Sequence, residues 1–268
     1  MSHNPTMENT VQQNQTPTNE NTLLSHAEAE EYRLYKQRKR LSDAAAALAK
    51  TQTLVKMEDD VQLICQRARR LKQAAVCVPP SKLTQAQYYL SGSEVSVNCL
   101  VGGNGETFAK VKAYEARQVA RRKVKEITLT IAPSLLDGCR YGEIRREIRR
   151  IKRAVGKTNL KVCVEKTYSP TALSRIARIA CEAGAKFFSV PYFEGCERLK
   201  NDLTGECRLE ITNVQSFEKF KKMLAMGVGR IGVDRAFEMY TQLLKEGEEK
   251  QKEDTRYVSN KEETPKQA

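Results

Sequence analysis

The chain has no tryptophan, and its only two histidines, His3 and His26, stand near the N-terminus. The sequence that follows therefore offers no imidazole to ligate a transition metal or to act as a general base. No apolar run approaches the roughly 18 residues that a membrane span needs. Residues 1–21 are rich in Asn, Gln and Thr and lack the apolar stretch of a secretory signal. These absences predict a protein with no membrane span, no metal site and no cofactor.

Paired cysteines are also missing. The eight cysteines are scattered singly, and none forms a Cys-x-x-Cys pair. In a chain of this length, such spacing is typical of reduced thiols and not of a disulfide framework or a zinc site. The sequence therefore predicts a cytoplasmic protein.

Positive charge, by contrast, is abundant: the chain has 46 Lys and Arg against 33 Asp and Glu, a net charge of +13. Much of it falls in two stretches, residues 117–125 and 140–157. The simplest interpretation is that these are solvated outer faces of helices. A small anionic ligand or a nucleic acid could also account for them. Without tryptophan or interleaved aromatic residues, however, base stacking has little support.

Composition divides the chain into four parts. Residues 1–26 are predicted to be a disordered polar tail, and residues 27–50 an N-terminal helix rich in Glu, Lys, Arg and Ala. Residues 51–247 alternate apolar runs with helical periodicity and are expected to form one domain. Residues 248–268 are a charged C-terminal tail, which we expect to fray from about Lys245 onward.

The middle part alternates short β-type runs with amphipathic helical stretches, eight times over. This pattern predicts parallel strands joined by crossover helices, and eight units favour a closed TIM (β/α)8 barrel, which needs about 250 residues. No Gly-x-Gly-x-x-Gly follows the first strand to indicate a dinucleotide fold. The predicted strands are Thr51–Val55, Ala75–Val78, Val95–Leu100, Ile127–Ile131, Leu160–Glu165, Phe187–Val190, Arg208–Thr212 and Arg230–Val233.

The sixth unit is abnormal, because only about 17 residues separate its strand from the seventh. A full loop, helix and return loop would be cramped there. We therefore expect a truncated helix around Glu197 to Asn201.

Five segments, in their order and spacing, carry a resemblance to a known family. They are Thr53-Leu-Val-Lys56, Ala74-Ala-Val-Cys-Val-Pro-Pro-Ser81, Lys112-Ala-Tyr-Glu-Ala116, Leu160-Lys-Val-Cys-Val-Glu165 and Arg230-Ile-Gly232. Together they resemble the deoxyribose-phosphate aldolases, over about residues 51–244. The resemblance implies a TIM barrel whose strand-six lysine forms a Schiff base with an aldehyde donor.

Several positions that this resemblance assigns to catalysis hold other residues here. The Schiff-base lysine corresponds to Ser189, and the second lysine, which activates the first, corresponds to Glu210. The strand-four aspartate corresponds to Thr128 and the strand-one acid to Thr51. Two family positions are retained, as Lys161 on strand five and Cys77 after strand two.

The phosphate-binding part of the family pattern is also depleted. Of the eighth-strand loop Gly232 remains, but it is followed by Asp234, whose charge would repel phosphate. A weaker candidate is the glycine-rich turn formed by Gly102, Gly103 and Gly105, which precedes a helix and could cradle an anion at its N-terminus.

Lys161 is the remaining candidate nucleophile on the inward face, which it is expected to share with Cys163 and Glu165. A nucleophilic lysine must be neutral near pH 7, yet Glu165 and Glu210 as neighbours would raise its pKa. We therefore interpret these side chains as an ion-pair cluster in the barrel mouth.

The leading hypothesis is a catalytically degenerate member of the family that acts in binding, regulation or scaffolding, with a protein partner or self-association possible. The first alternative is an active aldolase or lyase that uses Lys161 with Glu165 or Glu210. The second is an anion- or nucleic-acid-binding protein that acts through its basic helices.

Overall fold

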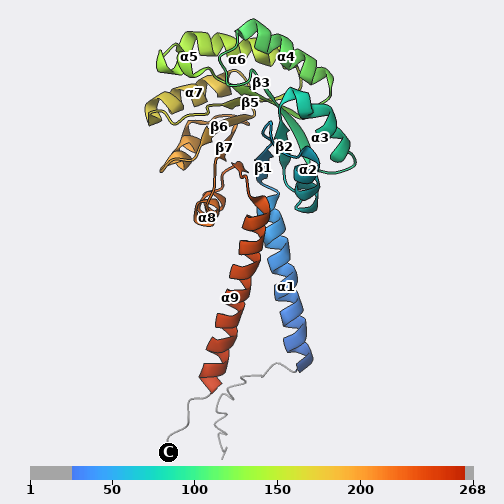
Figure 1. Ribbon diagram of the computed structural model, residues 1–268. Helices are drawn as coiled ribbons and strands as arrows, with labels where there is room; N and C mark the ends of the chain where they lie inside the picture. The colour runs from blue at the N-terminus through green and yellow to red at the C-terminus, as the bar shows by residue number, and fades with distance from the viewer. Residues whose placement is uncertain (1–25, 263–268) are drawn as a thin grey trace, which may run out of the picture. The chain divides into compact units, whose positions relative to one another are not determined.

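A computed structural model describes residues 26–262 (Figure 1). The predicted disorder of the first 25 residues and of the last six, residues 263–268, falls outside the described residues. Within the described part, no helix is long and apolar enough to cross a membrane.

Eight parallel strands close into a barrel in which each strand pairs with its neighbours in chain order and β8 pairs with β1. The sequence prediction of a TIM barrel is thereby confirmed. The strands are β1 Thr51–Leu54, β2 Ala75–Val78, β3 Ser96–Val101, β4 Glu126–Thr130, β5 Asn159–Cys163, β6 Phe187–Pro191, β7 Arg208–Thr212 and β8 Arg230–Gly232.

The strands alternate in character along their length, and this alternation creates the site. In β4, Ile127 and Leu129 are fully buried between the barrel and its helices, whereas Glu126 and Thr128 point into the barrel. Side chains two positions apart share one face of a strand, so a polar residue at every second position lines the interior. The layer between the strands and the helices is therefore aliphatic, whereas the interior of the barrel contains a cluster of polar side chains.

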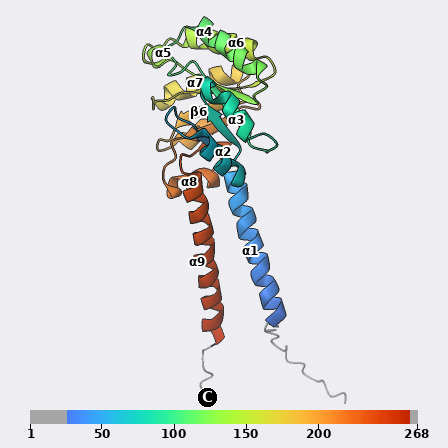
Figure 2. The same ribbon diagram turned by 45° about the vertical axis from the view of Figure 1, so that its right-hand side comes forward.

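Helices cover the outside of the barrel (Figure 1). In α6, Ile144, Ile148 and Ile151 are fully buried against the barrel, and the arginines between them are turned outward. Figures 1 and 2 both show α4 and α6 side by side. The covering helices are α2 Val61–Arg70, α3 Leu83–Tyr89 with the preceding 3₁₀ turn η1 Pro80–Lys82, α4 Ala109–Arg121, α5 Pro133–Asp137, α6 Tyr141–Val155, α7 Pro170–Glu182 and α8 Phe217–Ala225.

The sixth unit is truncated as the sequence predicts. Between β6 and β7 the chain forms only a short 3₁₀ helix, η2 Cys196–Asp202, which is anchored by the buried side chains of Cys196 and Leu199. A 3₁₀ helix rises more per residue than an α-helix, so it spans a cramped connection with fewer residues.

Two further helices flank the barrel in the chain: α1 precedes β1 and α9 follows β8. Helix α1 spans His26–Leu48; its residues up to Lys39 form a separate compact unit, and Ala44 and Leu48 are buried within the larger unit. Helix α9 spans Ala236–Glu262, so the expectation of fraying from Lys245 is wrong. Residues 245–262 contain no proline and are rich in Glu and Lys, which favour the helix once it has been started.

Candidate functional site

A cavity of about 340 Å³ opens at the carboxyl ends of the strands, where TIM barrels place their active sites. Strand-end residues such as Leu54, Pro191 and Thr212 line its walls. Its floor includes Gln52, Cys77, Thr128, Lys161, Ser189 and Glu210, and its rim includes Lys56, Glu165, Gln215 and Asp234. The structure therefore brings most of the residues predicted for the site into one cavity.

Lys161 lies at the centre of the floor and is 1% exposed. Its Nζ stands 2.9 Å from Glu126 Oε1 and 2.9 Å from Glu210 Oε2. It also donates to Gln52 Oε1 at 3.0 Å. Three acceptor side chains thus surround an ammonium that has three protons to donate, so the hydrogen bonding of Lys161 is complete.

Arg230 supplies the second cation of the same cluster. Its Nη1 lies 2.7 Å from Glu126 Oε1 and 3.6 Å from Glu210 Oε2, while its guanidinium sits 4.0 Å from the ring centre of Phe187. Asn98 Nδ2 donates to Glu126 Oε1 at 2.9 Å and to Gln52 Oε1 at 2.8 Å. Two cations and two carboxylates therefore balance, and the floor network carries no net charge.

The surroundings of Lys161 decide its protonation. Burial alone would lower the pKa of the Lys161 amine, but the Glu126 and Glu210 carboxylates together raise it above its ordinary value. The amine therefore carries its proton at neutral pH. A protonated amine has no lone pair with which to attack a carbonyl carbon.

The sequence-level expectation about these partners was right for Glu210 and wrong for Glu165. Glu165 is exposed at the rim, and its carboxylate lies 3.4 Å from the Thr130 hydroxyl. Glu126 takes its place beside Lys161. It was missed because the fourth strand was expected to begin at Ile127, although the strand begins one residue earlier.

Comparisons with known proteins find proteins of similar sequence and fold. No protein-family model matches the chain. The chain is 29% identical over 189 residues to the deoxyribose-phosphate aldolase of Carboxydothermus hydrogenoformans, covering 65% of this chain and 82% of that protein. It is 24% identical over 185 residues to the enzyme of that name from Clostridioides difficile, covering 65% of this chain and 84% of that protein.

The solved structures of similar fold include proteins named as aldolases. The tetrameric deoxyribose phosphate aldolase of Aeropyrum pernix superposes with a TM-score of 0.64 at 16% identity, covering 78% of this chain and 95% of that one. The aldolase QR15 superposes with a TM-score of 0.66 at 21% identity, covering 74% of this chain and 95% of that one. By sequence and by fold, the chain is similar to deoxyribose-phosphate aldolases.

Ser189, which the resemblance places at the Schiff-base lysine of the deoxyribose-phosphate aldolases, is fully buried on β6. Its hydroxyl donates to Glu210 Oε1 at 3.1 Å. Glu210 is at the same time bound to Lys161, so its carboxylate is held as an anion partner and is poorly placed to remove the serine proton. Ser189 is thus a hydrogen-bonded member of the network around Lys161.

The thiols at the mouth are also unreactive by this geometry. Burial raises the pKa of Cys77 to about 11 and that of Cys163 to about 12. Cys77 Sγ lies 3.7 Å from Thr128 Oγ1. Because the thiolate is the nucleophilic form, neither cysteine is activated at neutral pH.

Thr51, which the resemblance assigns to the strand-one acid of the family, does not line the mouth. Its hydroxyl donates to the carbonyl of Leu48 at 2.7 Å and accepts a hydrogen bond from Gln73 at 3.1 Å. The neighbouring Gln52 faces the cavity instead. Adjacent residues of a strand point to opposite faces, so Gln52, and not Thr51, is the residue of this pair that reaches the cavity.

The glycine-rich turn does not form an anion cradle at the mouth. Gly102, Gly103 and Gly105 adopt positive φ angles of 81°, 53° and 91°. The Gly102 amide already donates to the Glu115 carboxylate at 2.7 Å, and the Gly105 amide donates to the Gly102 carbonyl at 2.8 Å. Two of the amides that an anion would need are occupied, so the turn is structural.

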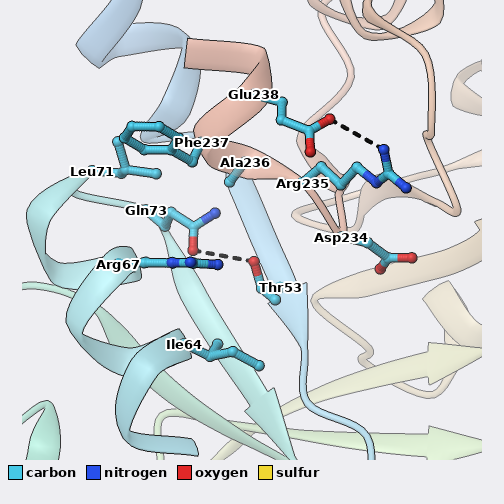
Figure 3. Close-up of a pocket in the computed structure, with 10 residues that line it drawn as sticks. All are labelled: Thr53, Ile64, Arg67, Leu71, Gln73, Asp234, Arg235, Ala236, Phe237 and Glu238. Carbon is cyan, nitrogen blue, oxygen red and sulfur yellow. Dashed lines mark hydrogen bonds and ion pairs between the residues drawn. The ribbon is translucent and has the colours of Figure 1, made fainter. Parts of the chain in front are cut away.

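Gly232 and Asp234 both line the mouth. Asp234 also borders a second cavity of about 230 Å³, between α2 and the start of α9 (Figure 3). Thr53 and Gln73 lie in this second cavity and are hydrogen-bonded to each other at 3.2 Å, as the close-up shows. Since the buried polar groups there are paired locally, the larger mouth is the better candidate site.

Proposed function

We propose that this chain is a member of the deoxyribose-phosphate aldolase family that does not catalyse aldol cleavage, and that its barrel mouth binds a small, uncharged polar ligand in a regulatory or scaffolding role. The observation that carries the proposal is the position of Lys161, 2.9 Å from each of two buried carboxylates. A Schiff base requires a neutral amine. In this mouth, the lysine on the inward face that could form one is held as an ammonium, and Ser189 occupies the strand-six position.

The charges around the cavity support an uncharged ligand. The charges of the floor network balance, so the rim residues determine the sign of the net charge around the cavity. The rim has one cation, Lys56, and two anions, Glu165 and Asp234. A phosphate would meet more negative than positive charge there. Hydroxyl groups of a ligand, by contrast, find Thr128, Thr212, Asn213 and Gln215 as hydrogen-bonding partners. The cavity volume of about 340 Å³ corresponds to a small molecule.

Self-association belongs to the same proposal. The Aeropyrum pernix relative is tetrameric, and we propose a homo-oligomer for this chain as well. Light scattering on the full chain measures its mass directly; a monomer at all concentrations would contradict this part.

Trapping with borohydride tests the catalytic part. The chain is incubated with deoxyribose phosphate or with acetaldehyde, reduced with sodium borohydride, and digested for peptide mass spectrometry. We expect no adduct at Lys161 and no release of aldehyde. The Clostridioides difficile relative serves as the positive control. An adduct on Lys161 that is lost in Lys161→Met would overturn the proposal in favour of an active lyase using Lys161 with Glu165 or Glu210.

Thermal shift measurements test the ligand. A panel of neutral sugars and polyols is compared with the phosphorylated form of each. We expect neutral members to raise the Tm of the wild type and Thr128→Val to weaken this effect, because the substitution removes a hydroxyl from the mouth. Thr53→Val, which removes a hydroxyl from the second cavity, is the matched control. Stabilisation by the phosphorylated forms alone would contradict the uncharged ligand.

A further inference from the structure

A second recognition surface lies on the outside of the barrel, where α4 and α6 run side by side (Figures 1 and 2). A hollow of about 400 Å³ separates their outer faces. Its lining consists of Lys110, Ala113, Tyr114 and Arg117 from α4, and Arg150, Arg153 and Ala154 from α6. We call this set the α4–α6 groove.

The α4–α6 groove is purely cationic. Its four charged residues, Lys110, Arg117, Arg150 and Arg153, are all exposed, and no acidic side chain lines the hollow. Within the part of the chain that the structure describes, none of the four has an ion-pair partner. Their charge is therefore available to a partner from outside.

The two walls of the groove are held together from beneath. Lys112 of α4 and Glu147 of α6 form a buried ion pair at 2.8 Å, with side chains 0% and 5% exposed. Lys112 Nζ also donates to the Thr130 carbonyl on β4 at 3.2 Å, which ties both helices to the barrel. The cations above this pair consequently stand on two fixed helices, and less ordering is needed when a partner binds.

Exposed aromatic rings accompany the cations. Tyr114 lies in the α4–α6 groove and is 64% exposed. A neighbouring hollow of about 480 Å³ shares Arg150 with the groove and is lined by Phe108, whose side chain is 84% exposed. Its charged lining is mixed, with Arg140 and Arg146 beside Glu106, Glu143 and Glu147. Aromatic rings beside a basic groove are stacking platforms for bases. Phe108 is the N-cap residue of α4 and precedes Tyr114 by six positions in the chain.

We propose that the α4–α6 groove binds single-stranded nucleic acid, with its four cations on the phosphates and a base stacked on Tyr114. An acidic peptide would use the cations but would gain nothing specific from the exposed rings. Duplex bases are already stacked on one another and would leave Tyr114 unused. The sequence alone gave this function little support because Tyr114 lies outside both Arg-rich stretches, and the fold brings it beside Arg150 and Arg153.

Fluorescence anisotropy with a short labelled oligothymidylate tests the cations first. We expect Arg150→Gln/Arg153→Gln to weaken binding and to reduce the slope of log K against log salt by about 1.4, which is two phosphate contacts on a single strand. Arg69→Gln/Arg70→Gln on α2 removes the same charge from exposed positions elsewhere and is the matched control. Undetectable binding at low salt, or equal weakening by the control, would overturn the proposal.

Substitution of Tyr114 then tests the stacking. We expect Tyr114→Ala to weaken binding about fivefold or more and Tyr114→Phe to preserve it, because the phenyl ring keeps the stacking face. Duplex DNA and polyglutamate are measured in parallel. If Tyr114→Ala has no effect, or if polyglutamate binds as tightly as the oligonucleotide, the groove is a general polyanion surface and the proposal is wrong.

Discussion

Basic side chains occur both in the barrel mouth and in the α4–α6 groove, but they are buried and paired with acids in the mouth and exposed in the groove. In the mouth, Lys161 is 1% exposed and lies between Glu126 and Glu210. In the groove, Arg150 and Arg153 are exposed and face no acid. The basic side chains of the groove therefore present their charge to solvent, while the charges of the mouth floor neutralise one another.

The comparison also separates what holds the fold from what can bind. A buried ion pair has little net benefit over a well-packed apolar pair, but the loss of one member leaves an uncompensated charge in a medium of low polarity. Removal of one charged side chain from the mouth network is thus expected to destabilise the fold strongly. An exposed arginine interacts with water and can change partners at little cost to the fold.

The largest expected effect comes from breaking the mouth network. Lys161→Met leaves Glu126 and Glu210 facing each other, with Arg230 as their remaining cation. We expect the free energy of unfolding to fall by about 3–5 kcal/mol, as measured by urea denaturation. Lys110→Met removes an exposed lysine and should cost no more than about 0.5 kcal/mol. Equal effects of the two substitutions would contradict the distinction between the regions.

An intermediate effect is expected from removing both carboxylates while keeping the lysine. In Glu126→Gln/Glu210→Gln, the amides still accept hydrogen bonds, so the loss of stability should be smaller than in Lys161→Met. Burial would then lower the pKa of Lys161, since the opposing charges are gone. We expect a borohydride adduct with acetaldehyde at Lys161 in this variant.

The single substitution Glu210→Gln is the control for that experiment. It keeps Glu126 at 2.9 Å from Lys161 Nζ, so the amine should stay charged and form no adduct. If the doubly substituted protein folds and still forms no adduct, pairing with carboxylates is not what makes Lys161 unreactive toward the aldehyde.

The smallest effect is expected in the α4–α6 groove. Arg150 and Arg153 are three positions apart on one helix, so their like charges repel each other across a turn. We expect Arg150→Gln to raise the free energy of unfolding slightly, by about 0.2–0.5 kcal/mol at low salt, and the gain to shrink as salt is added. A loss of stability would show that Arg150 has a structural partner.

The sequence predicts the eight strands because apolar runs bounded by turn residues leave a local signal. It does not predict the contents of the mouth equally well, because those depend on a single residue of register. Thr51 was given as the counterpart of the strand-one acid, but its neighbour Gln52 is the residue that lines the cavity. Glu126 was placed before its strand, although it is the first residue of β4 and a partner of Lys161.

Contacts between distant segments are a further limit on what the sequence reveals. Nothing near Tyr114 in the chain indicates that Arg150 will stand beside it, because the packing of α4 on α6 makes that contact. Similarly, Arg230 lies 104 residues from Glu126 in the chain, yet the two are joined by closure of the barrel. These pairings follow from the tertiary structure and have no local pattern.

The central claim is that Lys161 keeps its proton at neutral pH, and nuclear magnetic resonance of the lysine amines tests it most directly. The protein is labelled with ¹⁵N-lysine, and the Lys161 signal is assigned by its loss in Lys161→Met. Because the folded-state pKa is raised, its stabilising contribution should be complete below about pH 10.4, the ordinary lysine value, and be lost only as pH rises through the raised pKa. We predict an ammonium signal unchanged from pH 5 to 9. A neutral amine near pH 7 would contradict the account.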